Sequence, residues 1–246
     1  MPVIGHSFTV LQSVDSTNNY AMASVRAGVA VHGNAYFSTN QTAGKGQRGK
    51  AWQTNEGENL ALSIVIEPNG ILLSQRFLLS ISISLACYSL VKDYTGSGVT
   101  IKWPNDIYWC DRKAGGILIE NLIRGLNWQY AVAGIGLNIN QTIFPDHLPN
   151  PVSLKQVNGR THDPGQLAKE LCKYVESRFN QLLNGQHQML LDEYHELLYK
   201  RNQWVRLRQG TVVLGTLVKR VTSQGRLVTE HKVEQEFDVG EVEWIS

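Results

Sequence analysis

The sequence predicts an α+β fold in which helices pack on a mixed or antiparallel sheet, followed by a small β-barrel of SH3-like size. The first observation behind this prediction is a series of apolar, strand-like segments in close succession, with helical segments before and after them. The second is a change in the residue pattern after Asn202, where only short segments of alternating apolar and polar residues follow. We therefore expect a main domain over residues 1–202 and a C-terminal domain over residues 203–246.

The main domain is expected to begin its regular structure with a helix. Several N-cap residues between Asp15 and Asn19 precede a helical run that Gly28 can close. Later segments that are bounded by turn residues have the composition of strands. The expected elements are a helix over 20–27, strands over 29–39 (broken at 33–34), 60–67, 99–103, 116–123 and 128–139, and helices over 164–183 and 189–200. Residues 111–116 are expected to form a basic turn, and residues 124–127 a hairpin connection.

The most hydrophobic stretch, residues 71–91, could be mistaken for a membrane span. It contains Gln75, Arg76 and several serines, and its bulky residues recur at helical spacing. These bulky residues are Leu72, Phe77, Leu78, Ile81, Leu85 and Tyr88. The pattern predicts a helix with one apolar face that lies in the protein core, and no membrane segment.

The C-terminal domain is expected to consist of short alternating strands separated by turns. The strands cover residues 205–208, 211–221, 226–230, 234–239 and 242–245. A β domain of this size needs packing against the main domain to be stable.

The composition argues against several classes of protein. The 246 residues carry a formal net charge of +2, too small for a nucleic-acid-binding surface. The three cysteines are widely spaced, so they indicate neither a disulfide framework nor a Cys-based zinc site. The start of the chain lacks the pattern of a signal peptide, so a cytoplasmic protein with reduced thiols is expected. None of the seven histidines belongs to a recognisable metal-binding cluster.

The run Lys102-Trp103-Pro104-Asn105-Asp106 is the first motif that indicates chemistry. An apolar strand ends in a lysine, and Pro104 stiffens the strand end because it fixes its own φ and favours an extended Trp103. The adjacent Asn105 and Asp106 can bind a metal, a ribose or the backbone. Most lysines are ordinary surface residues, but this one is expected to hold its charge in a fixed place.

A glycine-rich basic loop, residues 41–52, is the second motif. Residues 44–49 formally match G-x-G-x-x-G, but no helix is expected after them, which argues against a dinucleotide-binding turn. The glycines let backbone N–H groups approach an anion, and Lys45, Arg48 and Lys50 add charge. By itself the loop is equally compatible with a solvated basic surface. Together with the first motif it indicates an enzyme that activates a carboxylate with a nucleotide.

With these motifs the sequence resembles the catalytic and C-terminal domains of biotin protein ligases, also called biotin–[acetyl-CoA-carboxylase] ligases. The shared motifs, in order, are Ser16-Thr17-Asn18, the loop 41–52, Lys102-Trp103-Pro104-Asn105-Asp106, Arg112-Lys113 before Gly115-Gly116-Ile117-Leu118, and Gly134-Ile135-Gly136-Leu137-Asn138. The resemblance covers nearly the whole chain and implies a class II synthetase-like biotin/lipoate ligase catalytic domain. It is closest in kind to the short forms without an N-terminal DNA-binding domain, so no DNA partner is expected.

The resemblance implies ATP-dependent biotinylation of a lysine on a biotin carboxyl carrier protein. The carboxylate of biotin attacks the α-phosphate of ATP, with Mg²⁺ on the phosphates, to give biotinyl-5′-AMP and pyrophosphate. The carrier's lysine then attacks the mixed anhydride and releases AMP. Because the first step joins two anions, Lys102 is expected to bridge the carboxylate and α-phosphate oxygens as the catalytic residue. The metal ligands stay unassigned, a homodimer is compatible with the sequence, and no membrane partner is expected.

The resemblance also assigns the remaining site residues. The residues expected to bind biotin are Ser16, Thr17, Asn18, Gln41, Gly44, Lys45, Gly46, Gln47, Lys102, Gly115 and Gly116. Those expected to bind ATP or the adenylate are Lys45, Arg48, Lys50, Trp52, Asn105, Lys113 and Asn138. Ser16 could instead be a simple N-cap and Trp52 a core residue. The commonest family pattern has arginines where Lys45 and Gln47 stand, which puts tight retention of the adenylate in doubt.

Two other functions stay open from the sequence. A lipoate–protein ligase or octanoyltransferase shares the fold, but the polar Ser16, Thr17 and Gln41 suit a ureido ring better than an apolar dithiolane. A non-catalytic module that binds biotin or a nucleotide is the other alternative. It would not need the phosphate-handling charges of the basic loop.

Overall fold

The computed structural model describes residues 1–125 and 127–245, and a seven-stranded sheet lies at its centre. In spatial order the strands are β1 (Ser7–Leu11), β2 (Asn34–Ser38), β3 (Leu60–Ile66), β7 (Asn127–Leu137), β6 (Arg112–Arg124), β5 (Asp106–Trp109) and β4 (Val99–Lys102). β1 and β2 run parallel and every other neighbouring pair runs antiparallel. This arrangement confirms the predicted mixed sheet.

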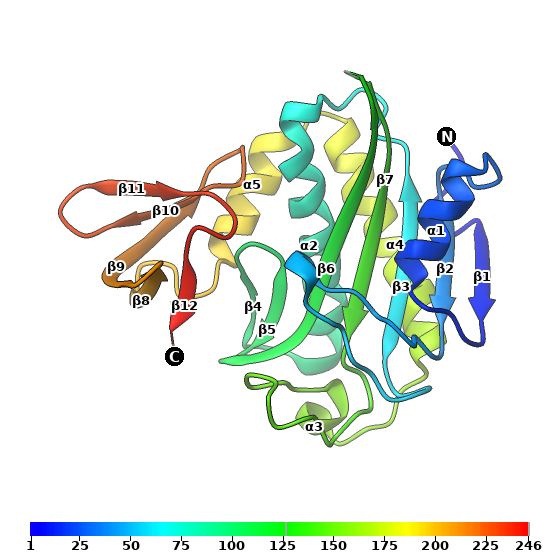
Figure 1. Ribbon diagram of the computed structural model, residues 1–246, viewed down its shortest axis with the longest axis horizontal. Helices are drawn as coiled ribbons and strands as arrows, with labels where there is room; N and C mark the ends of the chain where they lie inside the picture. Colours follow the sequence, from blue (N-terminus) through cyan, green and yellow to red (C-terminus); the bar gives the residue numbers. More distant parts are fainter. Residues whose placement is uncertain (126, 246) are drawn as a thin grey trace.

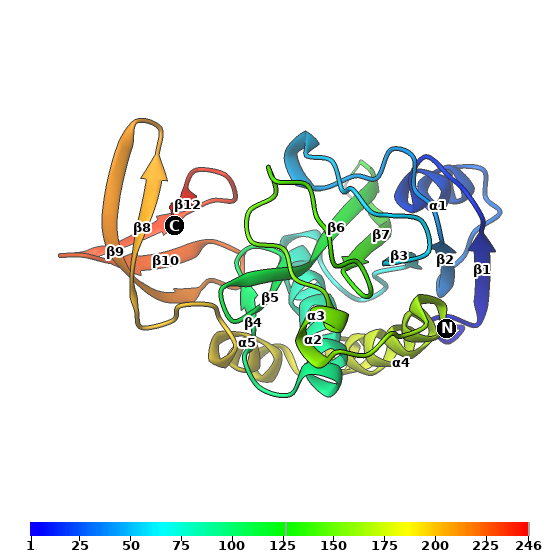
Figure 2. The ribbon, with the colours of Figure 1, turned by 90° about the horizontal axis from the view of Figure 1, so that it is seen from below.

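Helices lie on both faces of this sheet (Figures 1 and 2). α1 (Thr17–Arg26) packs on one face, against β2, β3 and β7. The other helices lie on the opposite face and are α2 (Arg76–Thr95), α3 (Leu154–Asn158), α4 (Pro164–Leu183) and α5 (His187–Glu196). The basic loop, which contains a 3₁₀ turn at Gln47–Gly49, lies on the α1 side. The next regular element after that turn is the strand β3, so the rejection of a dinucleotide-binding fingerprint is confirmed.

α2 is the hydrophobic helix that the sequence predicts, preceded by a 3₁₀ turn at Leu73–Gln75. The segment Leu73–Thr95 is long and apolar enough to cross a membrane, and 67% of its most apolar window is buried inside the protein. It contacts β4, β5 and β6 on one side and α4 and α5 on another. Buried residues therefore lie around most of its circumference, and the expected single apolar face is wrong because the helix is enclosed between two layers.

Other sequence expectations need correction at particular elements. β1, β5 and α3 were not predicted, and β2 begins only at Asn34. The basic turn expected over residues 111–116 is wrong, since β6 already begins at Arg112 and pairs with β5 and β7. β6 and β7 form the expected hairpin, of which Leu126 lies outside the described residues.

A second, five-stranded sheet forms the C-terminal part of the protein. In spatial order its strands are β11 (Glu234–Phe237), β10 (Leu227–Glu230), β9 (Val212–Val221), β8 (Trp204–Gln209) and β12 (Glu243–Ile245). All neighbouring pairs run antiparallel, as expected for a small SH3-like domain. Among the described residues, no ladder joins the edge strands β11 and β12. A domain boundary near residue 202 stays a prediction.

The C-terminal sheet is firmly seated on the main domain. Trp103 Nε1 donates to the carbonyl of Gly225 at 2.9 Å, and His195 Nε2 lies 2.8 Å from the carbonyl oxygen of Val221. Leu207, Val218 and other side chains of the second sheet belong to the same buried cluster as the core of the main domain. The two sheets therefore share one core, which fixes the C-terminal sheet beside β4.

Candidate active site

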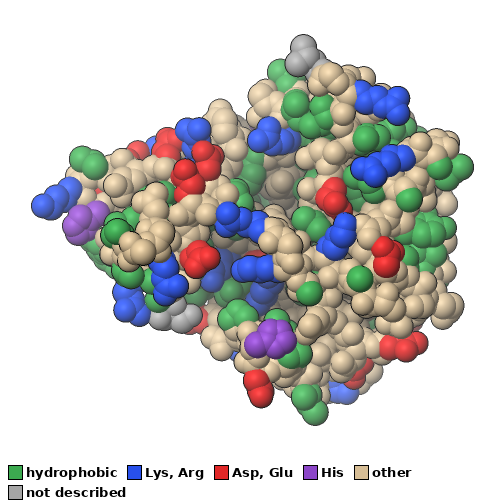
Figure 3. Space-filling view, in the orientation of Figure 1, with side chains coloured by type: hydrophobic (Ala, Val, Ile, Leu, Met, Phe, Trp, Pro, Cys, Tyr) green, Lys and Arg blue, Asp and Glu red, His purple; other side chains and the backbone are tan. Residues whose placement is uncertain are grey.

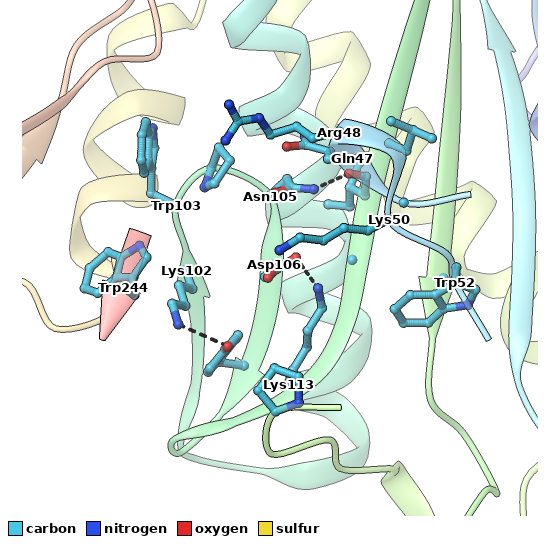
Figure 4. A pocket seen from close by; sticks show the side chains of 18 of the residues that line it. Gln47, Arg48, Lys50, Trp52, Lys102, Trp103, Asn105, Asp106, Lys113 and Trp244 are labelled. Carbon is cyan, nitrogen blue, oxygen red and sulfur yellow. Dashed lines mark hydrogen bonds and ion pairs between the residues drawn. The ribbon is translucent and has the colours of Figure 1, made fainter. Parts of the chain in front are cut away.

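A cavity of about 1370 Å³ lies between strands β4 to β7 of the main sheet and the C-terminal sheet. Its floor is formed by β4, β5, β6 and β7, and its walls by α1, the basic loop, residues 144–151 and β12. Lys and Arg side chains gather around this hollow (Figure 3), and Figure 4 shows side chains that line it. A cavity lined in this way suits a large anionic ligand.

Most residues predicted from the sequence meet in this cavity. They are Ser16, Thr17, Asn18, Gln41, Lys45, Gly46, Gln47, Arg48, Lys50, Trp52, Lys102, Asn105, Lys113, Gly116 and Asn138. Gly44 and Gly115 are not among the lining residues. An ideal Cβ on Gly44 would lie 2.3 Å from the carbonyl oxygen of Trp52, and one on Gly115 would lie 2.3 Å from Leu137 Cδ2. The structure gives these two glycines a packing role, because only glycine permits such close approach.

The end of the cavity beside α1 is neutral and rich in hydrogen-bonding groups. Thr17 donates to Gln41 Oε1 from its backbone N at 2.8 Å and from Oγ1 at 3.1 Å. Because the oxygen of Gln41 is engaged, the Nε2 hydrogens are the ones that can donate to a ligand. Ser16 is at the N-cap position of α1, but its hydroxyl makes no capping hydrogen bond. The simple N-cap interpretation of Ser16 therefore does not hold.

Asn18 is held by a buried network that the sequence analysis missed. Its Nδ2 donates to the carbonyl of Leu118 at 3.2 Å and to Glu120 Oε2 at 2.9 Å. Ser63 Oγ lies 2.6 Å from Asn18 Oδ1 and 2.8 Å from Thr17 Oγ1, and its single hydrogen can serve only one of them. A serine inside the otherwise apolar buried run Leu60–Ile66 was the signal that could have revealed this support.

We expect Ser63→Ala to lower the free energy of unfolding by about 1–3 kcal/mol, because it leaves a buried acceptor of Asn18 or Thr17 without its donor. Urea denaturation measures this change. Ser82→Ala is the matched control: Ser82 is equally buried, but its hydroxyl donates to the carbonyl of Leu78 in its own helix at 3.0 Å. The control is expected to lose less, and equal losses in both variants would contradict the supporting role of Ser63.

The basic loop folds back on itself over the cavity. The backbone N of Trp52 donates to the carbonyl of Gly44 at 2.8 Å, and that of Gly46 donates to the carbonyl of Lys50 at 2.7 Å. Arg48 at the tip has a φ of 57° and reaches the C-terminal sheet, where an ideal Cβ on Gly240 would lie 2.1 Å from its Cζ. The loop therefore bridges the cavity from the main domain to the second sheet.

Trp52 and Asn138 line the part of the cavity over β7. The Trp52 ring lies directly on Gly136, where an ideal Cβ would be 2.4 Å from its Cε2. Asn138 Nδ2 donates to the carbonyls of Lys113 and Val152 at 3.3 and 3.1 Å, so its Oδ1 remains to accept from a ligand. This end combines an aromatic face with a fixed acceptor, which suits a purine base.

Lys113 lies in the middle of the cavity. Its Nζ forms an ion pair with Asp106 Oδ1 at 2.7 Å and lies 5.9 Å from the centroid of the Trp52 ring. It is also 3.5 Å from the position that a Cβ on Gly116 would take. Asn105 forms two hydrogen bonds with Ile117 of β6. Its backbone carbonyl accepts from the N of Ile117 at 3.0 Å, and its Nδ2 donates to the carbonyl of Ile117.

Lys102 lies between Trp244 of the C-terminal sheet and Asp106, with Lys113 on the other side of Asp106 (Figure 4). Its Nζ lies 3.1 Å from Tyr108 Oη, and the ring centroids of Tyr108, Tyr199 and Trp244 lie 4.7, 5.4 and 5.2 Å away. Burial lowers the pKa of Lys102 and raises that of Tyr108. The sequence analysis placed Lys102 in the site, but it missed the three aromatic residues around it.

The carboxylates that line the cavity are few. In the described part of the chain, no group of three or more His, Cys, Asp or Glu side chains could hold a metal ion. Asp106 pairs with Lys113, and Asp111 pairs with Lys200 Nζ at 2.8 Å. Mg²⁺ carried on phosphates needs only one or two carboxylates, so these two acids fit that role and not that of a resident metal centre.

Comparisons with known proteins find a matching family model and several similar proteins. Residues 10–138 match the model of the "Biotin/lipoate A/B protein ligase family". The chain is 28% identical over 173 residues to the "Bifunctional ligase/repressor BirA" of Bacillus spizizenii, an alignment that covers 69% of this chain and 53% of that protein. It is 27% identical over 223 residues to the "Biotin--[acetyl-CoA-carboxylase] ligase" of Mycobacterium tuberculosis, covering 89% and 81%. The chain thus spans about half the length of its Bacillus relatives.

A solved structure shows the same fold. The "Biotin protein ligase from Aquifex aeolicus in complex with biotin and ATP" superimposes with a TM-score of 0.82 at 21% identity, covering 98% of this chain and 99% of that chain. The match extends over both sheets, so the second sheet is part of the shared architecture.

Proposed function

The chain belongs to the biotin/lipoate A/B protein ligase family, and we propose that it activates biotin with ATP and transfers the biotinyl group to a lysine of a carrier protein. The observation that carries this proposal is that one cavity contains three environments: a neutral polar end at Thr17 and Gln41, the ammonium of Lys113, and an aromatic wall at Trp52. A ureido ring, a carboxylate and an adenine need these three environments.

The polar end supports biotin over lipoate. A ureido ring offers one carbonyl and two N–H groups, which suit the Ser16 hydroxyl and the Nε2 hydrogens of the Gln41 amide, whose oxygen Thr17 holds. A dithiolane would leave these groups of Ser16 and Gln41 without partners, at a cost of about 1–3 kcal/mol for each that is buried. An octanoyl chain has the same disadvantage.

Lys113 is our choice for the cation at the acyl phosphate. A carboxylate oxygen of biotin attacks the α-phosphorus of ATP, the bond to the bridging oxygen of the β-phosphate breaks, and pyrophosphate leaves with that electron pair. The Lys113 ammonium lies near Trp52 in the cavity that also contains the polar end, and Asp106 holds it over Gly116, so we place it in contact with both reacting anions. Mg²⁺ on the phosphates supplies further charge neutralisation, and Asp106 or Asp111 would contact it.

In the second step the amine of the acceptor lysine attacks the acyl carbonyl and AMP leaves. The acceptor is a biotin carboxyl carrier protein in our proposal. The Lys45 and Arg48 side chains of the basic loop would lie over the adenylate and keep water from it. A cytoplasmic location and a homodimer remain predictions from the sequence.

Biotin-dependent exchange of labelled pyrophosphate into ATP tests this function. We expect exchange with biotin and none with lipoate or octanoate run in parallel. Exchange with lipoate would move the protein to the lipoate branch of the family. The absence of exchange with every acid, together with retained biotin binding, would instead support a non-catalytic binding module.

A further inference from the structure

Four residues that pair across neighbouring strands form a row on the floor of the cavity. The strand registers pair Lys102 with Asp106, Asp106 with Gly116, and Gly116 with Gly136, so the row crosses β4, β5, β6 and β7. Residues paired in this way face the same side of the sheet. The row spans three inter-strand steps of about 4.8 Å, roughly 14 Å in total.

The row has a direction. Trp52 lies over Gly136 at one end, the Lys113 ammonium lies beside Gly116 and Asp106 in the middle, and Lys102 is at the other end. With adenine against Trp52 and the α-phosphate at Lys113, an extended triphosphate continues along the row toward Lys102. The β- and γ-phosphates then arrive at the lysine beside the C-terminal sheet.

The surroundings of Lys102 leave its charge available. Lys113 and Lys200 each pair with an aspartate, whereas among the described residues no carboxylate lies within ion-pair distance of Lys102. Its ammonium is instead enclosed by an aromatic box, which we define as Tyr108, Tyr199 and Trp244. Aromatic faces stabilise a cation without neutralising it, so the ammonium can still attract an anion.

The aromatic box draws its walls from three separate parts of the chain. Tyr108 is on β5, Tyr199 follows α5, and Trp244 is on β12 of the second sheet. Tyr199 is itself fixed, because its Oη donates to Asp111 Oδ1 at 2.7 Å and its ring packs against Trp244 with centroids 5.7 Å apart. The second sheet therefore completes the surroundings of Lys102.

We propose that Lys102 and its aromatic box form a subsite for the pyrophosphate part of ATP, and that Trp244 is a positioning residue through which the C-terminal sheet takes part in adenylation. This inference rests on the proposed function. When the bond between the α-phosphorus and the bridging oxygen breaks, the electron pair goes to the pyrophosphate, and the added charge develops next to Lys102. Lys113 contacts the α-phosphate and the acyl group, and Lys102 contacts the pyrophosphate, so the two lysines act on different parts of the nucleotide.

The test compares Lys102→Ala and Trp244→Leu with the wild-type protein. Calorimetric binding of pyrophosphate is expected to weaken about 10- to 100-fold in Lys102→Ala, as for loss of a hydrogen bond to a charged group. The KM for pyrophosphate in the exchange reaction should rise in both variants, while the KM for biotin and the transfer rate from supplied biotinyl-5′-AMP stay unchanged. Trp244→Phe should restore most of the loss seen in Trp244→Leu, because it keeps an aromatic face.

Lys219→Ala is the control for the loss of a positive charge. Lys219 lies on β9 of the second sheet, does not line the cavity, and pairs with Glu230 at 2.9 Å. It should bind pyrophosphate as the wild type does. Unchanged pyrophosphate binding in Lys102→Ala, or an equal loss of transfer from supplied adenylate, would overturn the subsite. If the wild type showed no exchange with any acid, the proposed function would fail, while direct pyrophosphate binding would still decide the subsite.

Discussion

Replacing Lys113 with alanine is expected to lower biotin-dependent pyrophosphate exchange by about 10²- to 10³-fold, the range for removal of one group that stabilises developing charge. The physical reason is the position of its ammonium, beside Trp52 and Asp106 in the cavity where the two anions must meet in our proposal. Without it, carboxylate and α-phosphate repel each other in a partly enclosed site. Initial exchange rates at saturating biotin measure the effect.

Two further variants make this prediction specific. Lys113→Arg keeps the charge but replaces a compact ammonium with a planar fork, so we expect a partial loss. Lys155→Ala removes a lysine of α3 that does not line the cavity and should exchange normally. If Lys113→Ala exchanged normally and Lys102→Ala lost both half-reactions, Lys113 would not be the cation at the acyl phosphate. That role would then belong to Lys102, as the sequence analysis expected.

The sequence predicted most of the fold where local patterns are strong. α4 spans the predicted residues 164–183 because Asp163 caps it and Pro164 opens it, and β3 is a continuous apolar run between turns. β1 and β5 were missed, although strands as short as β4 were predicted. Their place in the sheet depends on pairing with strands that the local sequence does not reveal.

The candidate site was predicted as a set of residues but not as an arrangement. The sequence placed Lys113 in a basic turn because its neighbours Asp111 and Gly115 are typical of turns, yet the segment is the start of a long paired strand. The aromatic box joins Lys102 to Trp244, which are far apart in the sequence and on different sheets. Such a contact follows from how the two sheets pack on each other, and no periodicity in the chain encodes it.

Gly134→Ala and Gly136→Ala are expected to separate the two ends of the cavity. The residues are two positions apart on β7 and face the same side. An ideal Cβ on Gly134 would lie 2.2 Å from Asn18 Oδ1, and one on Gly136 would lie 2.4 Å from Trp52 Cε2. Each added methyl group must therefore displace the side chain above it, at about 1–3 kcal/mol for overpacking.

Calorimetry with biotin and with a non-hydrolysable ATP analogue measures the outcome. Gly134→Ala should weaken biotin binding about tenfold or more, because Asn18 cannot move without breaking its bonds to Leu118 and Glu120, whereas nucleotide binding should hold. Gly136→Ala should show the opposite pattern, because a displaced Trp52 no longer offers its face to the base. Each variant is the control for the other. Equal weakening of both ligands in both variants would mean that the methyl groups distort the sheet as a whole, and the assignment of biotin and adenine to opposite ends would be wrong.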